Sequence, residues 1–519
     1  MDDLADGVRA ALDVDVDAFE TRVEREAEAL KAELSVGTFD NPGAIVGLEH
    51  EFYAVDARTD VLRRVPAPLL ELIGFEKELG RHNAELAGRP QPFGPHGLAA
   101  LRHEVQAAVR AAHAAAAEAE GIRLVADGGW TVPPVAETAR EYLAACEHVD
   151  GLRLSPNVPP SVRYHVMSNT PHYEPRRRLE TPNVTLETPT IAPASFTTSI
   201  QPHYQVPTAA ALPMQFAYAL RVAGPLLALA ANSPLFPPSL YDADATVEDV
   251  LETASLEGRI GLYEDVMNDP DRPAKVRFPR DLEDAGEAID RIAADPPIAP
   301  ATPAACERFD GRFAHLRHKH GSYWRWVRPV FGGASEAAAN ARIEFRPLPG
   351  QPTVRDATAL VAVFGGLMRG LPATDHPVVD LPWERARENF YAAADAGLAA
   401  ELHWRSADGS ETTDADELYD DLFGVAAEGL ELAGFDASTV DARLRPLRAR
   451  VAARTSPAGW KRTRLRAHAD DGASLSTAVL ETGSDYLAAQ ADTLVGGTFA
   501  DWPGVQPRDT TPFKPERGR

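Results

Sequence analysis

The chain has 519 residues and a net charge of −25 at pH 7, from 77 acidic and 52 basic residues. This acid excess argues against nucleic acid as the main partner, because phosphates are collected by basic surfaces. Only six of the basic residues are lysines. A GC-rich genome would explain few lysines, but the acid excess favours a protein kept soluble at high salt, where ions screen self-repulsion. We therefore expect a halophilic protein.

Cysteine usage and hydropathy restrict the compartment. Cys146 and Cys306 lie far apart and have no metal-type spacing, so neither a disulfide framework nor a zinc site is indicated. No apolar run approaches the ~20 residues that a membrane span needs, and the acidic N-terminus lacks the pattern of a signal peptide. The sequence predicts a soluble cytoplasmic protein without a membrane or nucleic-acid partner, and leaves homo-oligomerisation open.

The first part of the chain predicts a mixed core of helices and strands. Residues 4–34 have the pattern of one amphipathic helix, and residues 45–55 alternate as a β-strand does. An Ala-rich helix over 98–120 ends at Gly121, and residues 122–126 form the next strand. The order strand, helix, strand favours an α+β or α/β core.

The middle of the chain is less regular. Residues 131–194 are Pro-rich, with a strand predicted at 162–167. Residues 196–206 alternate again, although Pro202 removes a ladder donor and favours an edge strand or a bulge. The segment 208–231 predicts the most apolar helix of the chain.

The C-terminal part predicts one more polar strand and then helices. Residues 341–347 alternate as a strand and residues 354–370 as a helix, while 381–495 have a helical pattern with acidic linkers. The expected domains are an N-terminal helix (1–36), a catalytic core (37–380), a helical extension (381–496) and a poorly ordered tail (497–519).

The strand over 45–55 carries two glutamates on one face. Glu49 and Glu51 point the same way because side chains alternate along a strand, and apolar neighbours predict that the strand is half buried. Two carboxylates in such a place repel each other and lose hydration unless a cation neutralises them. For an isolated pair, two solvated glutamates on an edge strand would be the simpler interpretation.

Three predicted strands share this design of one apolar face and one polar face, at 45–55, 196–206 and 341–347. Side by side, they would form a surface lined with carboxylates and guanidiniums. Mg²⁺ prefers oxygen ligands and binds substrate phosphates, and arginines clamp phosphates. The pattern suits metal-bridged phosphoryl transfer. Neither a P-loop nor a G-x-G-x-x-G fingerprint is present, so a nucleotide would lie on the sheet.

Several motifs resemble those of the glutamate–cysteine ligase family and related carboxylate–amine ligases. They occur in the family's order across residues 43–370, and residues 385–480 are similar to the helical tail of one bacterial branch. The histidine-rich strand of the family is reduced to His203, and the segment 131–194 is unfamiliar, so substrate specificity does not transfer. The motifs are Gly47-Leu-Glu-His-Glu-Phe52, Asn83-Ala-Glu-Leu-Ala-Gly88, Thr198-Ser-Ile-Gln-Pro-His-Tyr-Gln205, Leu227-Ala-Leu-Ala-Ala-Asn-Ser-Pro-Leu-Phe236 and Arg342-Ile-Glu-Phe-Arg346.

The resemblance implies a glutamine-synthetase-like fold, in which an antiparallel sheet forms a concave active site with helices on its outer face. It implies that Mg²⁺-ATP, or Mn²⁺-ATP, phosphorylates a glutamate-like carboxylate and that an amine such as cysteine attacks the acyl phosphate. The implied roles are these: metal ligands Glu49, Glu51, Glu85 and Glu344; catalytic residues Glu51 and Arg346; nucleotide contacts His203, Arg325 and Arg328, with His203 a metal ligand as the alternative.

Two other classes of function remain open from the residues. A non-catalytic relative could bind a nucleotide or an amino acid as a sensor, although it would have no reason to keep clustered carboxylates. The acidic face could instead be a halophilic surface of a structural protein. Turnover separates the first alternative from an enzyme, and Mg²⁺-ATP affinity after mutation of Glu49 and Glu51 separates the second.

Overall fold

The computed structural model describes residues 2–304 and 306–505, and its centre is an eight-stranded sheet. The main strand order is β11-β12-β10-β1-β3-β2, and β4 and β5 also pair with β1. Every pairing in this sheet is antiparallel, which confirms the predicted α+β fold. The strands are β1 (Ile45–Asp56), β2 (Glu76–Lys77), β3 (Asn83–Ala87), β4 (Gln91–Pro92), β5 (Ile122–Val125), β10 (Ile200–Gln205), β11 (Val327–Gly332) and β12 (Asn340–Phe345).

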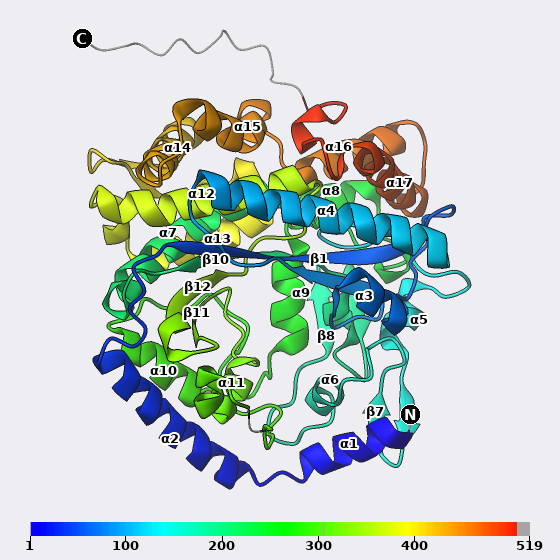
Figure 1. Cartoon of the computed structure of the whole chain (residues 1–519). Helices are drawn as coiled ribbons and strands as arrows, with labels where there is room; N and C mark the ends of the chain where they lie inside the picture. Colours follow the sequence, from blue (N-terminus) through cyan, green and yellow to red (C-terminus); the bar gives the residue numbers. More distant parts are fainter. Residues whose placement is uncertain (1, 305, 506–519) are drawn as a thin grey trace, which may run out of the picture.

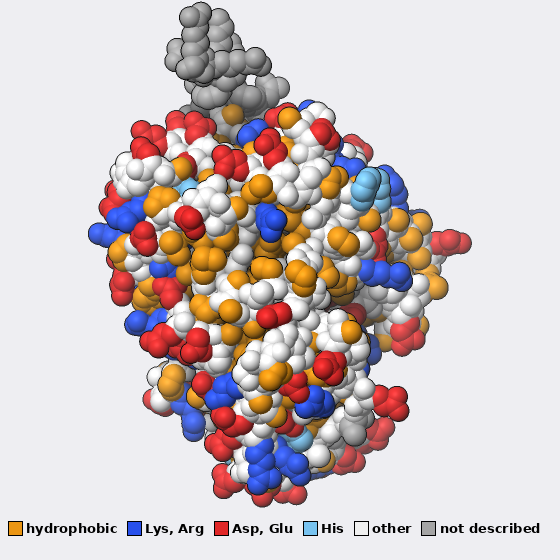
Figure 2. Space-filling view, turned by 60° about the vertical axis from the view of Figure 1, so that its left-hand side comes forward, with side chains coloured by type: hydrophobic (Ala, Val, Ile, Leu, Met, Phe, Trp, Pro, Cys, Tyr) orange, Lys and Arg blue, Asp and Glu red, His pale blue; other side chains and the backbone are white. Residues whose placement is uncertain are grey.

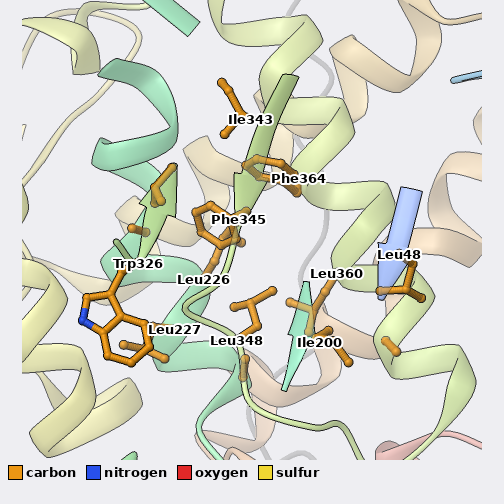
Figure 3. Packing of buried hydrophobic residues seen from close by; sticks show 14 of the residues in the cluster. Leu48, Ile200, Leu226, Leu227, Trp326, Ile343, Phe345, Leu348, Leu360 and Phe364 are labelled. Carbon is orange, nitrogen blue, oxygen red and sulfur yellow. The ribbon is translucent and has the colours of Figure 1, made fainter. Parts of the chain in front are cut away.

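One face of the sheet is apolar and packs against helices (Figure 3). Leu48 of β1 and Ile343 of β12 are almost completely buried in this layer. The rings of Phe345 on β12 and Phe364 on α12 (Val354–Ala373) stack with centroids 4.5 Å apart. Because side chains alternate along a strand, this packing turns the glutamates of β1 to the other face.

Helices form two layers above the apolar face of the sheet (Figure 1). The helices α7 and α12 contact the strands, and the C-terminal helices lie beyond them. The helices of the sheet side are α3 (Ala67–Ile73), α4 (Pro95–Glu120), α7 (Leu212–Ala230) and α13 (Trp383–Ala396). The outer helices are α14 (Ala415–Leu432), α15 (Ala437–Ala453), α16 (Pro457–Asp470) and α17 (Leu475–Thr493).

The remaining elements lie mostly on the side of the sheet that carries the glutamates (Figure 1). They include three short hairpins, of which β13–β14 belongs to the C-terminal part. The hairpins are β6 (Glu147–Val149) with β7 (Leu152–Leu154), β8 (Arg178–Thr181) with β9 (Val184–Glu187), and β13 (Trp404–Arg405) with β14 (Glu411–Thr412). The helices on this side are α5 (Ala139–Ala144), α6 (Val162–Met167), α9 (Gly258–Met267), α10 (Ala285–Ala293) and α11 (Ala314–His320). The helix α8 (Val247–Thr253) instead contacts α16 on the side of the outer helices (Figure 1).

Two buried ion pairs join the C-terminal helices to the rest of the chain. Arg450 of α15 lies 2.9 Å from Asp356 of α12, and both side chains are fully buried. Lys461 of α16 pairs with Asp127, which follows β5. Removing one partner of a buried pair typically costs 3–5 kcal/mol. The outer helices are therefore attached to the core by more than apolar contact, while the predicted domain boundaries stay a prediction.

The N-terminal segment is two helices, and the prediction of one helix over 4–34 was wrong. The helix α1 (Asp2–Leu12) ends before a short break, and the side chain of Asp15 accepts a hydrogen bond from Ala18 N at the start of α2 (Val16–Ser35). Asp favours such N-cap positions over helix interiors, which explains the break. The two helices cross the bottom of the molecule opposite the sheet, with α1 on α6 and α2 on α10 and α11 (Figure 1).

Two other local predictions were wrong. The segment Val162–Met167 is the helix α6 rather than a strand, because so short an apolar run fits both periodicities. Pro202 lies in β10, which is an interior strand between β1 and β12 rather than an edge. The ladder between β10 and β12 begins at His203, one residue after the proline.

The last described residues also differ from the expectation of a poorly ordered tail. Phe499 and Trp502 are buried, and the Trp502 ring packs against Trp460 and Tyr486 with centroids about 5 Å apart. Residues up to 505 therefore belong to the packed structure. Residues 506–519, the rest of the predicted tail, lie outside the described residues.

One apolar segment, Ala209–Ala230, is long and apolar enough to cross a membrane by length and composition, which the sequence analysis did not expect. Of the 18-residue apolar window in this segment, 83% is buried inside the protein, so the segment packs as a core helix. Acidic and basic side chains are interspersed on the face seen in Figure 2 rather than gathered in a basic stripe.

Candidate active site

The polar face of the sheet borders two adjoining cavities. The smaller one, of about 320 Å³, is lined by Glu49 and Glu51 of β1 together with side chains from α6 and α9. The larger one, of about 860 Å³, extends from Glu49 past the ends of β10, β11 and β12. Glu49, Arg328 and Gly321 line both. The sheet therefore presents its carboxylates to one continuous polar region.

The first cluster consists of Glu49, His203 and Glu344, which we call the histidine triad. His203 and Glu344 are cross-strand partners on β10 and β12. Each residue offers a ligand atom, and these atoms lie within 4.8 Å of one another. The His203 Nε2 atom is buried, has no hydrogen-bond partner and lies 3.3 Å from Glu49 Oε1. An orphaned imidazole nitrogen between two carboxylates fits a divalent cation.

Arginines neutralise Glu344 in this triad. Arg328 donates a hydrogen bond from Nε to Glu344 Oε2 at 2.9 Å, and Arg346 donates to Oε1. Burial opposes ionisation of Glu344, but Arg328 and then Arg346 outweigh it and hold the pKa of this carboxyl well below its usual range. Glu344 is therefore ionised without a metal.

The second cluster consists of Glu51, Glu78 and Glu85, which we call the carboxylate triad. Glu51 and Glu85 are cross-strand partners on β1 and β3, and Glu78 follows β2 at the edge of the sheet. Their ligand atoms also lie within 4.8 Å of one another. Among the residues that the structure describes, no arginine, lysine or histidine forms an ion pair with any of the three. Three oxygen donors in this arrangement fit Mg²⁺ or Mn²⁺.

Burial and mutual repulsion keep this triad partly protonated in the absence of a cation. Burial, followed by the charge of Glu78, raises the pKa of Glu51 to about 7. Burial, followed by Glu78, Glu49 and Glu51, raises the pKa of Glu85 strongly. The pKa of Glu78 is also raised, chiefly by burial. A bound cation would replace these protons.

Gln201 and Ser199 of the β10 segment connect the two triads. Ser199 donates to Glu51 from its backbone N at 2.7 Å and from Oγ at 2.9 Å. Gln201 Nε2 donates to Glu51 Oε1 at 3.1 Å, while its Oε1 accepts a hydrogen bond from Arg346 at 2.7 Å. This amide fixes Glu51 relative to Arg346, which is one of the two arginines that pair with Glu344 of the histidine triad.

A model of the glutamate–cysteine ligase family 2 matches residues 45–479 of this sequence. The chain belongs to this family. The match confirms the resemblance drawn from the motifs, and it supports an enzyme that joins a carboxylate to an amine. A comparison of the sequence with curated proteins finds no match.

Solved structures with a similar fold include glutamate–cysteine ligase from Francisella tularensis in complex with AMP. The TM-score is 0.51 at 12% identity, over 88% of this chain and 91% of that chain, which shows a shared fold. The bifunctional glutathione synthetase from Pasteurella multocida has a TM-score of 0.46 at 14% identity, over 90% and 55% of the two chains. The complex of the prokaryotic ubiquitin-like protein Pup with its ligase PafA gives 0.40 at 11%, over 91% and 77%.

The structure brings together most of the residues predicted for the ligase site. Glu49, His203 and Glu344 meet in one triad, and Glu51 and Glu85 meet in the other. Their roles as ligands and as catalytic groups stay predictions, as do those of the two arginines beside Glu344.

Arg325 differs from the other predicted nucleotide contacts. It lines the smaller cavity, but its Nη2 donates to Asp295 Oδ1 at 2.8 Å and its Nη1 to the carbonyl of Lys275. The guanidinium also lies over the Tyr323 ring, 4.2 Å from its centroid. With these partners Arg325 has fewer free donors for a phosphate than Arg346, so its role as a nucleotide contact is the least supported of the set.

Three residues of the smaller cavity were missed by sequence reasoning. Glu78 follows a two-residue strand that has no alternation long enough to detect. Arg259, at the start of α9, donates to the carbonyl of Arg346 at 3.0 Å and so fixes the backbone directly after β12. Arg163 lies on α6, inside the segment whose secondary structure was predicted wrongly. Of these three residues, only Arg163 could have been found by a search for isolated charged residues in apolar segments.

Proposed function

We propose that this protein is an ATP-dependent carboxylate–amine ligase that uses glutamate as the acyl donor and an amine such as cysteine as the acceptor. The observation that carries the proposal is the pair of triads on one sheet face. One triad contains a buried histidine nitrogen without a hydrogen-bond partner, and the other consists of three carboxylates that have no ion-pair partner among the described residues. Family membership supports the reaction class. The AMP complex of the Francisella tularensis enzyme supports nucleotide use.

Each triad would hold one Mg²⁺ or Mn²⁺ ion. The ions would supply charge neutralisation on transferring phosphate oxygens, which is the usual metal contribution to phosphoryl transfer. Glu51 would act through its place in the carboxylate triad, where Ser199 and Gln201 orient it. Arg328 and Arg346 stand beside the histidine triad and would neutralise charge on the phosphoryl group.

The reaction transfers the terminal phosphate of ATP to an oxygen of the donor carboxylate and releases ADP. The amine nitrogen then attacks the acyl carbon, the C–O bond to phosphate breaks, and the amine gives up a proton as the amide forms. The larger cavity next to the histidine triad has the volume for a nucleotide, which typically needs several hundred Å³. The nucleotide would thus enter beside Glu49, His203 and Glu344.

The test is ADP release by the purified protein with Mg²⁺, ATP, glutamate and a panel of amines that includes cysteine, in molar KCl. We expect amine-dependent ADP release that the Glu51→Gln variant lacks. A matched control is Glu71→Gln, on the exposed side of α3. ADP release that no amine stimulates, with any carboxylate donor, would contradict the proposal.

The second candidate function is a non-catalytic relative that binds a nucleotide or an amino acid. Calorimetric titration with a nonhydrolysable ATP analogue and Mg²⁺ measures that binding. Tight binding without turnover in any donor and acceptor combination would favour the sensor.

Cytoplasmic location and adaptation to high salt are proposed from composition. If the acid excess serves solubility at high salt, thermal stability should rise with KCl concentration as screening relieves self-repulsion. A melting temperature that falls as KCl is raised would argue against it.

A further inference from the structure

Arg163 differs from the other arginines of the smaller cavity. Five arginines line this cavity, and four of them have a carboxylate within 4.0 Å: Arg259 with Glu257, Arg325 with Asp295, and both Arg328 and Arg346 with Glu344. Within the described residues, Arg163 has no such partner. Its Nη2 donates a hydrogen bond to the carbonyl of His318 at 3.3 Å.

The guanidinium of Arg163 lies against Gly321, in space that a side chain at position 321 would enter. A Cβ atom on Gly321 would lie 2.4 Å from Arg163 Nη2 and 2.6 Å from Nη1. Gly321 ends α11 with φ −61° and ψ −16°, a conformation open to any residue, so its backbone does not require glycine. A larger residue at position 321 would displace the end of the Arg163 side chain from its present place.

Arg163 lines the cavity of the carboxylate triad rather than the cavity proposed for the nucleotide. It belongs to α6 and lines the smaller cavity, which contains the carboxylate triad, but it does not line the larger cavity beside the histidine triad. The same cavity is also lined by apolar and aromatic side chains, among them Met167, Tyr263 and Trp324. A guanidinium without a protein carboxylate in such a wall is a site for a small anionic ligand.

Resting on the proposed ligase function, we propose that Arg163 binds the α-carboxylate of one of the two amino-acid substrates, and that Gly321 exists to admit its guanidinium. The planar fork of arginine matches a carboxylate and can donate two parallel hydrogen bonds. Both substrates, glutamate and an amino acid such as cysteine, carry an α-carboxylate that takes no part in the reaction. Arg163 is thus a specificity residue contributed by the segment 131–194.

The test compares each amino acid with its decarboxylated analogue in Arg163→Met and the wild type. The pairs are glutamate with 4-aminobutyrate for the donor, and cysteine with cysteamine for the acceptor. In one pair, we expect the variant's preference for the amino acid over its decarboxylated analogue, measured as the ratio of kcat/KM values, to fall by about 10- to 100-fold. This is the effect of losing a charge-assisted hydrogen bond. The pair affected identifies the substrate that Arg163 binds.

Two further variants keep the test valid if Arg163→Met folds poorly. Gly321→Ala displaces the guanidinium without removing it and should reduce the same preference by a smaller factor. Arg163→Lys keeps the charge but loses the fork and should fall between the wild type and Arg163→Met. The matched control is Arg89→Met, whose side chain is 87% exposed, and it should leave both preferences unchanged.

Direct binding separates this inference from the ligase function. Calorimetry with the four compounds and Mg²⁺, without ATP, should show weaker amino-acid binding in Arg163→Met and unchanged binding of the decarboxylated analogue. If that pattern occurs without turnover in the wild type, the ligase proposal fails and the arginine assignment stands. If turnover occurs and both preferences persist in Arg163→Met, or if only the KM for ATP rises, the assignment is overturned.

Discussion

The two triads contain similar ligands in opposite electrostatic settings. In the histidine triad, Glu344 lies between Arg328 and Arg346, so the protein itself supplies positive charge. In the carboxylate triad, Glu51 accepts hydrogen bonds from neutral groups and has no ion-pair partner among the described residues. One cluster is balanced before a metal binds, and the other is not.

This difference predicts that the two triads bind metal ions with different affinities. An uncompensated cluster of buried carboxylates gains more from a divalent cation than a compensated one, because the cation removes repulsion as well as filling the site. The carboxylate triad should therefore bind a resident metal ion tightly. The histidine triad, which arginines already neutralise, should bind its ion more weakly and together with the nucleotide.

The largest expected effect is that of Glu51→Gln. It removes one ligand of the carboxylate triad, and losing several kcal/mol of transition-state stabilisation lowers kcat/KM by about 10³-fold. Titration with Mn²⁺ should show loss of the tighter site, whereas Glu49→Gln should retain it. If both variants lose the same site, the two triads do not act as separate metal sites.

The next effect is that of Arg346→Met, which breaks the charge balance of the histidine triad. Removal of a preorganised group that stabilises developing charge lowers kcat by about 10²- to 10³-fold. Mn²⁺ affinity at the carboxylate triad should change little, because Arg346 pairs with Glu344. Steady-state kinetics and Mn²⁺ titration of one preparation measure kcat and Mn²⁺ affinity. Loss of the tight Mn²⁺ site would contradict the prediction that the two triads bind metal separately.

A smaller effect is expected of Gln201→Leu, which removes the connection between the triads. Partners that orient metal ligands typically contribute 10- to 100-fold to activity or metal affinity. We expect a fall in kcat within that range and retained folding, measured by ADP release and thermal melting. The matched control is Gln106→Leu on α4, which removes a glutamine hydrogen bond to the carbonyl of Val495 and should leave kcat unchanged.

The smallest effect is a pH dependence of metal-induced stability. The folded pKa of Glu51 is about 7, above its usual 4.5, so the metal-free protein loses stability as pH rises between these values. A cation replaces the proton, and its stabilising effect therefore grows over the same interval. We expect the rise in melting temperature on adding Mn²⁺ to be larger by about 1–3 °C at pH 7.5 than at pH 5.5.

The Glu51→Gln variant is the control for that measurement, since glutamine cannot titrate and should flatten the dependence. Glu344 should not contribute, because its arginine neighbours keep its pKa low in the folded state. A metal-induced rise that is equal at both pH values in the wild type would show that the carboxylate triad is ionised without a metal.

Sequence reasoning found the parts of the site that lie on regular strands. Alternation placed Glu49 and Glu51 on one face, and the family motifs added Glu85, His203 and Glu344. These residues could be predicted because a strand of five or more residues fixes where each side chain points. The apolar helices followed from helical periodicity, whereas the antiparallel sheet was implied by the resemblance to the ligase family.

The parts of the site that could not be predicted lie where the local sequence pattern and the tertiary structure disagree. Glu78 follows a strand of two residues, which leaves no period to recognise. Val162–Met167 alternates like a strand but folds as α6, so Arg163 could not be assigned to a cavity wall. Pro202 is tolerated inside the sheet because the pairing of β10 with β12 begins at the next residue, His203.

The two-helix N-terminal segment has a practical consequence for anyone preparing this protein. Gly7 of α1 lies against Val162 of α6, so close that a Cβ on this glycine would come within 2.8 Å of Val162 Cγ2. At the other end, Glu26 of α2 pairs with His315 of α11 at 2.7 Å. The segment thus braces both the helix that carries Arg163 and the helix that ends at Gly321, although residues 2–35 line neither cavity. Given the role proposed for Arg163, deletion of residues 2–35 should alter substrate preference from a distance and leave the proposed metal ligands on the sheet in place.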